Sequence, residues 1–108
     1  MSFNVKSIDV SERQAKRLAK KYPSLKSELL TLITTLKTYP DSGIALGNNC
    51  YKIRLSIASK GKGKSGGGRV ITSLVIRENA VYLLSIYDKS EKENLTDREL
   101  QELLSQVP

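Results

Sequence analysis

The sequence predicts an α+β fold in which helices pack on one face of an antiparallel sheet. Apolar residues recur at helical intervals over residues 11–39, and from Cys50 onward the spacing changes to alternation. Three alternating segments then follow one another through short connections, which favours antiparallel pairing. The expected order is strand, two helices, three strands and helix. The three-stranded antiparallel meander would complete a four-stranded sheet, and 108 residues fit a single domain over residues 1–108.

The N-terminal half is expected to hold a short strand and an antiparallel helix hairpin. Residues 3–8 alternate apolar and polar side chains, which predicts the first strand. Ser11 lies three residues before Gln14, the spacing of a capping box, and this predicts the start of the first helix. Pro23 ends that helix, and Ser24 is expected to cap the second one. The apolar stripe of the second helix consists of Leu25, Leu29, Leu32, Ile33 and Leu36.

The C-terminal half is expected to supply three strands and a closing helix. Residues 50–57 alternate apolar side chains with basic or polar ones, so this strand should have one apolar and one basic face. The lysine- and glycine-rich residues 60–68 predict a flexible loop. Residues 69–77, rich in β-branched side chains, predict a central strand, and a tight turn leads to the third strand over 81–87. Thr96 and Glu99 have capping-box spacing and predict an amphipathic helix.

Composition restricts the class of protein and its chemistry. A net charge of +7 points to nucleic acid, an anionic membrane surface or an acidic protein as partner. The chain contains no histidine, which excludes Ser/His/Asp triads, Cys/His pairs and most zinc sites. We therefore expect neither a metal nor a cofactor. Cys50 is the single cysteine and cannot form an internal disulfide, and no apolar run is long enough to span a membrane. Both observations suit a cytoplasmic protein.

The positive charge is concentrated in one part of the chain. No acidic residue lies between Asp41 and Glu78. The basic residues of that stretch are Lys52, Arg54, Lys60, Lys62, Lys64, Arg69 and Arg77. Like charges side by side on a sheet destabilise it, and lysines beside glycine backbone N–H groups suit phosphate. The pattern therefore predicts that the chain binds an anionic polymer, with a merely solvated basic face as the alternative.

Three segments resemble a known family. They are Gly-Asn-Asn-Cys-Tyr-Lys-Ile-Arg-Leu at 47–55, Gly-Arg-Val-Ile at 68–71 and Leu-Ser-Ile-Tyr-Asp-Lys-Ser-Glu-Lys at 84–92. With the element order, they resemble the RelE/ParE superfamily, and within it the RelE-type toxins of bacterial type II toxin–antitoxin systems. The resemblance implies a toxin that inhibits translation by cutting mRNA in the ribosomal decoding site. In such cleavage the 2′-hydroxyl of the mRNA attacks the adjacent phosphate, leaving a cyclic phosphate and a free 5′ end.

The same resemblance implies roles for residues at matching positions. That reaction needs cations around the phosphate and groups that exchange protons with the attacking and leaving oxygens. Lys52 is implied as the base or electrostatic activator, with Arg54 beside it on the same strand face. Arg69 is implied as the phosphate clamp, and Lys89 as the cation near the leaving group. RelE-type toxins carry a catalytic tyrosine in their C-terminal helical segment, and the matching segment here has none. Tyr87, the nearest tyrosine, is the catalytic candidate in its place, with packing against the sheet as the alternative.

Two alternatives to an mRNA endonuclease stay open. ParE-like members share the fold and inhibit DNA gyrase without cutting RNA, and a plain RNA- or DNA-binding module is the third reading. The RNA-binding residues expected outside the catalytic set are Lys60, Lys62, Lys64 and Arg77. The expected partners are the ribosome with its mRNA and an acidic, partly disordered cognate antitoxin. Operator DNA would be reached only through that antitoxin, and no membrane is expected.

Overall fold

A five-stranded sheet forms the centre of the computed structural model within residues 2–61 and 66–108, the part of the chain that the structure describes. The strand order is β1-β5-β4-β3-β2. The strands are β1 (Asn4–Ser7), β2 (Ile44–Gly47), β3 (Cys50–Leu55), β4 (Gly68–Val75) and β5 (Ala80–Asp88). β1 pairs with β5 in parallel, and all other neighbours pair antiparallel. The predicted RNA contacts Lys62 and Lys64 lie outside the described residues.

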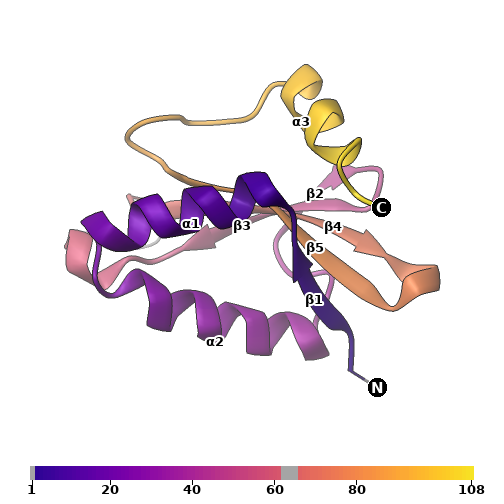
Figure 1. Cartoon of the computed structure of the whole chain (residues 1–108), viewed down its shortest axis with the longest axis horizontal. Coiled ribbons are helices and arrows are strands. Elements are labelled where there is room, and N and C mark those ends of the chain that lie inside the picture. The colour runs from indigo at the N-terminus through magenta and orange to yellow at the C-terminus, as the bar shows by residue number, and fades with distance from the viewer. Residues whose placement is uncertain (1, 62–65) are drawn as a thin grey trace.

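Helices cover both faces of this sheet (Figure 1). α1 (Asp9–Lys21) and α2 (Leu25–Thr38) pack on one face, here called the hairpin face, where Leu18, Leu25 and Leu36 are fully buried. α3 (Asp97–Leu104) packs on the other, here called the α3 face, where Leu100 and Leu103 are buried. No helix among the described residues has the length and apolar character needed to cross a bilayer.

The predicted α+β class is confirmed, and β4 is the central strand as expected. Two details differ. β2 was not predicted, because its four residues are exposed and show no alternation between a buried and a solvated face. The expectation that all helices share one face is wrong for α3, whose leucines bury apolar side chains of β4 and β5 on the opposite side.

The predicted capping box of α1 is wrong. Ile8 is the residue that precedes the helix, and Ser11 lies one turn inside it, where its hydroxyl donates to the Ile8 carbonyl at 2.9 Å and accepts from the Ile8 N–H at 3.2 Å. Gln14 instead crosses to the sheet, and its side-chain oxygen accepts from the Ile86 N–H at 2.8 Å. Ser11 therefore fixes the entry of α1, while Gln14 attaches the helix to β5.

The other two predicted helix starts have opposite outcomes. Ser24 precedes α2 but makes no side-chain cap, because its hydroxyl is engaged with Glu28 and Ser59. The capping box of α3 is confirmed: the Thr96 N–H donates to Glu99 Oε1 at 2.9 Å, and the Glu99 N–H donates to Thr96 Oγ1 at 3.1 Å. The start of α3 is thus fixed by its own first turn.

A fully buried carboxylate, Asp88, ties three segments together at the end of β5. It accepts hydrogen bonds from the Tyr22 hydroxyl at 2.6 Å and from Ser90, and it pairs with the Lys60 ammonium. Burial alone would raise the pKa of Asp88. The hydrogen bonds from Lys60, Tyr22 and Ser90 outweigh burial and hold that pKa far below its ordinary value of 3.8.

We predict that the unfolding free energy falls as the pH drops below about 4. Because the pKa of Asp88 is lowered by folding, its contribution is fully present above the unfolded-state pKa and is lost as the pH falls toward the folded-state pKa. One such group gives a slope of at most about 1.4 kcal/mol per pH unit. Urea unfolding at a series of acidic pH values should show a shallower slope for Asp88→Asn. Asp41→Asn, at an exposed carboxylate, is the control, and an equally shallow slope there would contradict the assignment.

Candidate active site on the α3 face

Three side chains form a row across the α3 face near one end of the sheet. Strand pairing sets Arg54 of β3 opposite Arg69 of β4, and Arg69 opposite Tyr87 of β5. Residues directly opposite each other on neighbouring strands point to the same side and lie about 5 Å apart. We call Arg54, Arg69 and Tyr87 the arginine–tyrosine row. Lys52, two residues before Arg54 on β3, projects from the same face.

The two arginines of the row differ in exposure. Arg54 is exposed, whereas Arg69 is only 4% exposed, and its Nη1 donates to the Gly68 carbonyl at 2.9 Å. A guanidinium held in place offers several N–H donors in a fixed plane, an arrangement that suits two oxygens of one phosphate. Arg69 is therefore preorganised to bind an anion, and Arg54 can approach the same anion from the solvent side.

Tyr87 presents a buried hydroxyl beside Arg69. The side chain is 5% exposed, and its oxygen has no hydrogen-bond partner among the described residues. Burial raises the pKa of Tyr87; Arg69 acts in the opposite direction, and Glu99 adds to the rise. The hydroxyl consequently stays protonated at neutral pH. An unpaired buried hydroxyl costs stability, and this cost makes Tyr87 a candidate functional residue.

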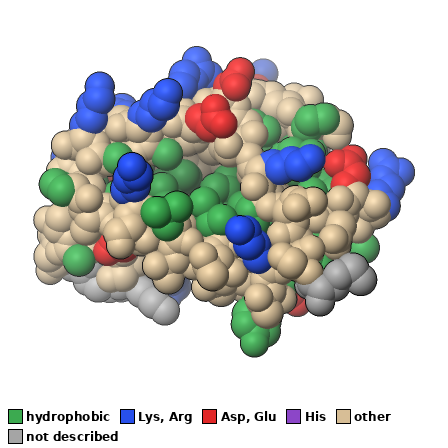
Figure 2. All heavy atoms as spheres, turned by 60° about the horizontal axis from the view of Figure 1, so that its bottom comes forward, with side chains coloured by type: hydrophobic (Ala, Val, Ile, Leu, Met, Phe, Trp, Pro, Cys, Tyr) green, Lys and Arg blue, Asp and Glu red, His purple; other side chains and the backbone are tan. Residues whose placement is uncertain are grey.

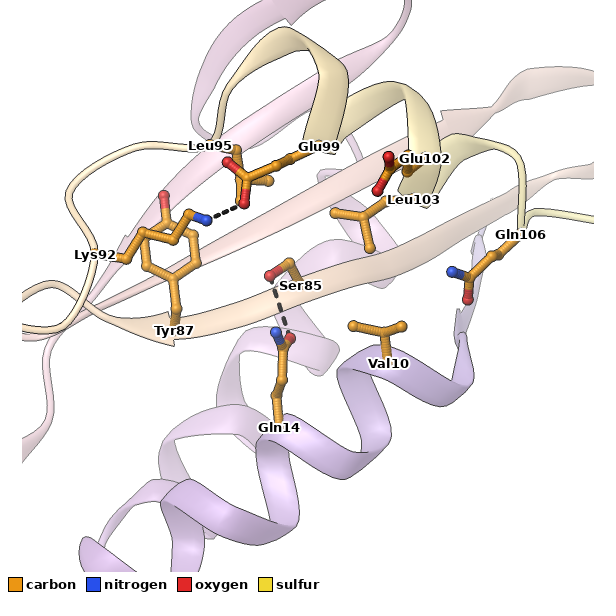
Figure 3. Close-up of a pocket in the computed structure, with 10 residues that line it drawn as sticks. All are labelled: Val10, Gln14, Ser85, Tyr87, Lys92, Leu95, Glu99, Glu102, Leu103 and Gln106. Carbon is orange, nitrogen blue, oxygen red and sulfur yellow. Dashed lines mark hydrogen bonds and ion pairs between the residues drawn. The ribbon is translucent and has the colours of Figure 1, made fainter.

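A cleft of about 250 Å³ lies between α1 and α3, with β5 as its floor (Figure 3). The residues that line it are Val10, Gln14, Ser85, Tyr87, Lys92, Leu95, Glu99, Glu102, Leu103 and Gln106. Lys92 extends toward α3 and pairs with Glu99 across the cleft. Lys92 is not among the site residues predicted from the sequence, although it closes the 84–92 segment that carries the resemblance. Its position three residues after Lys89 was the available signal.

The remaining predicted catalytic residues, Lys52 and Lys89, lie near the row. Lys52 is half-buried and donates to Asn94 Oδ1 at 2.9 Å, in the segment that leads to α3. Lys89 is also half-buried and follows β5 directly, one residue beyond Asp88. Lys52 lies two residues before Arg54 along β3, and Lys89 lies two residues after Tyr87. Their catalytic roles remain predictions.

Two predicted RNA contacts are placed elsewhere. The Lys60 side chain is 10% exposed, and its ammonium is paired with Asp88. Arg77 is exposed in the short 3-10 turn Ile76–Glu78 beyond the other end of β4, and the strand from Arg69 to Val75 alone spans about 20 Å. In Figure 2, lysine and arginine side chains stand along the upper edge and also within the face shown, so basic charge is spread over the surface. No cluster of three metal-ligating side chains occurs among the described residues.

The sheet order, the helix hairpin on one face and the C-terminal helix on the other define a class of small α+β proteins with known structures. An arginine-to-alanine double mutant of the E. coli toxin RelE in the free state is similar, with a TM-score of 0.61 and 18% identity over 98% of this chain and 94% of that one. The isolated E. coli RelE toxin has a TM-score of 0.58 and 16% identity, over 98% of this chain and 100% of that one.

The family model for the RelE toxin of the RelE/RelB toxin–antitoxin system matches residues 10–106. This chain therefore belongs to the RelE toxin family, and the resemblance carried by the three sequence segments is confirmed. Membership in a family of toxin–antitoxin systems implies an antitoxin partner.

We predict that the Lys92–Glu99 pair holds α3 over the cleft. The hydrogen bond from Lys92 is the main cause of the lowered pKa of Glu99. Glu99→Gln keeps an oxygen for the capping bond to Thr96 but loses the charge attraction. Because this pair is partly exposed and screened, the α3 amides should exchange hydrogen only about two to three times faster.

Hydrogen-exchange mass spectrometry or NMR measures this effect. The matched control is Glu102→Gln on the same helix, whose pair with Arg98 is largely exposed and should leave exchange unchanged. Equally faster hydrogen exchange in both variants would show that loss of any charge on α3 loosens the helix. The contact with Lys92 would then have no specific role in holding α3.

Proposed function

We propose that this chain is the toxin of a type II toxin–antitoxin system that cuts mRNA on the ribosome, and that the arginine–tyrosine row performs the cleavage. The observation that carries the proposal is the cross-strand pair of Arg69 and Tyr87. This pair sets a buried guanidinium beside a buried, protonated hydroxyl, on a face that also holds Arg54 and Lys52.

The chemistry follows from these groups. The 2′-oxygen of the mRNA attacks the adjacent phosphorus, the bond from phosphorus to the 5′-oxygen breaks, and a cyclic phosphate and a free 5′-hydroxyl result. Arg69 and Arg54 would hold the non-bridging oxygens, where negative charge grows in the transition state. Lys52 would first give up its hydrogen bond to Asn94. It would then either accept the 2′-proton as a base or assist loss of that proton electrostatically. Tyr87 would give its proton to the departing 5′-oxygen.

The closed state of the row supports a dependence on the ribosome. Arg69 and Tyr87 are each no more than 5% exposed, so a phosphate can reach them only after neighbouring chain moves aside. The 89–96 segment and α3 lie over the Tyr87 side of the row, and the Lys92–Glu99 pair joins them. Contacts with the ribosome would supply the free energy for that opening. An isolated chain would then cut RNA poorly.

The gyrase alternative gains nothing from this geometry, because an inhibitor that binds a protein has no need for a phosphate-sized site. A plain RNA-binding module would more often present exposed aromatics for base stacking, whereas Tyr87 is buried. We further propose that the antitoxin implied by the family is acidic in the segment that meets this basic chain. Operator DNA would then be bound through the antitoxin.

We predict that expression of the wild-type chain in bacteria arrests growth and produces new mRNA 5′ ends inside translated codons. Arg69→Ala should lose both effects, because the phosphate loses its clamp, with cleavage falling by about a hundredfold or more. Mapping of mRNA 5′ ends after induction measures this. Arg77→Ala removes the same charge at the other end of β4 and should behave like the wild type. Arrest with intact mRNA would refute the nuclease and favour gyrase as the target.

We predict opposite effects of Tyr87→Phe on activity and stability. Loss of the proton donor should lower kcat by about 10² or more. Removal of an unpaired buried hydroxyl should leave the unfolding free energy unchanged or slightly raised. Single-turnover cleavage of ribosome-bound mRNA and urea unfolding measure the two quantities on the same preparation. Unchanged cleavage in a stably folded Tyr87→Phe would remove Tyr87 from the mechanism.

A further inference from the structure

Asp88 lies one residue beyond the arginine–tyrosine row and on the other side of the sheet. Its strand partner is Gly68, the neighbour of Arg69. Since successive strand residues point to opposite faces, Tyr87 points to the α3 face and Asp88 to the hairpin face, where Tyr22 of α1 meets it. The carboxylate is fully buried, and its hydrogen bonds go to Tyr22, Lys60 and Ser90. Any influence on the row must pass through the backbone of the strands.

Segments next to the three strands that supply the row meet near Asp88. Lys60 ends the short 3-10 turn that follows β3, the strand of Arg54. Next to Asp88, the Lys89 N–H donates to the Gly67 carbonyl at 3.1 Å, directly before β4. A Cβ at Gly67 would lie 2.2 Å from the Leu55 carbonyl oxygen, so only glycine allows β4 to begin this close to the end of β3. The ends of three strands therefore meet around one carboxylate.

A buried ion pair is a weak source of net stability, because removing both charges from water offsets their attraction. What such a pair does provide is a defined separation between the groups that carry the charges. Here it links the chain that follows β3 to the last residue of β5, across the start of β4. Arg54 and Tyr87 belong to these same two outer strands and project from the opposite face.

We propose that Asp88 is a positioning residue for the cleavage reaction: by holding Lys60, it fixes the ends of β3, β4 and β5, and so sets the relative placement of Arg54, Arg69 and Tyr87. The proposal rests on the proposed function, since cleavage is the reaction that this placement serves. It also assigns Lys60 to the framework of the site, in place of the direct RNA contact expected from sequence.

Two of the side-chain partners of Asp88, Lys60 and Tyr22, allow a matched test. Lys60→Met with Asp88→Asn removes both charges at similar volume, an exchange that buried ion pairs often tolerate without loss of stability. Tyr22→Phe removes the hydrogen bond from the Tyr22 hydroxyl to the carboxylate and leaves the ion pair intact. With ribosome-bound mRNA as substrate, the double variant should lose about tenfold or more in kcat while KM stays within about twofold. Tyr22→Phe should retain kcat within about twofold, although its unfolding midpoint falls.

Three outcomes would overturn the proposal. In one, the folded double variant keeps the wild-type kcat. In another, Tyr22→Phe loses as much kcat as the double variant, which would show a purely structural role. In the third, the double variant has a higher KM and an unchanged kcat. That result would indicate that Lys60 contacts the RNA directly. If the double variant lacks native circular dichroism, Lys60→Gln alone, which keeps a donor for Asp88 without the charge, is judged by the same kcat and KM criteria.

A second readout does not depend on cleavage. In ¹H–¹⁵N NMR spectra, the backbone signals of Arg54, Arg69 and Tyr87 should shift in the double variant and stay in place in Tyr22→Phe. Unchanged signals in the double variant would refute the positioning role whether or not the chain is a nuclease. A wild-type chain that cuts no mRNA would refute the proposed function, while the NMR comparison would still decide the role of Asp88.

Discussion

Among the described residues, the Asp88 carboxylate is the one negative charge that is completely buried, and the geometry of the sheet end depends on how that charge is satisfied. Burial of an ionised group is expensive unless it is paired and hydrogen-bonded. Tyr22, Lys60 and Ser90 supply that compensation from three separate segments. Each segment is therefore held at hydrogen-bonding distance from β5. The cost of the buried charge is what makes the arrangement specific, since a displaced partner leaves it uncompensated.

Strand alternation connects this constraint to the candidate site. On β3, Ile53 and Leu55 face the hairpin core, while Lys52 and Arg54 face α3. On β5, Ile86 belongs to the hairpin core and Tyr87 to the opposite cluster. The same short strands thus supply the main core on one side and a cationic row on the other. Packing of α1 and α2 on the hairpin face holds the strands in place. The α3 face is covered only by the shorter helix α3 and can therefore hold charged side chains.

Sequence reasoning predicted the parts of the fold that depend on periodicity and failed where tertiary contacts decide. The alternation over residues 50–57 was enough to predict that Lys52 and Arg54 share a face, and pairing added Arg69 and Tyr87 to it. β2 has no such period, because both of its faces are exposed. Lys60 could not be separated from the other loop lysines, since nothing in the sequence shows that Asp88 is buried beside it. Ser11 has the spacing of a cap, yet the chain enters the helix three residues earlier.

The position of Tyr87 changes what movement of the C-terminal helix would do. The family resemblance implies a catalytic tyrosine in the C-terminal helical segment, so displacement of that segment would withdraw the proton donor. In this chain the candidate donor lies on β5, inside the sheet and opposite Arg69. Movement of α3 would leave the donor and the phosphate clamp in register and would change only their access to solvent and substrate. Under the proposed function, the strands therefore hold the chemistry, while α3 and the Lys92–Glu99 pair control access to it.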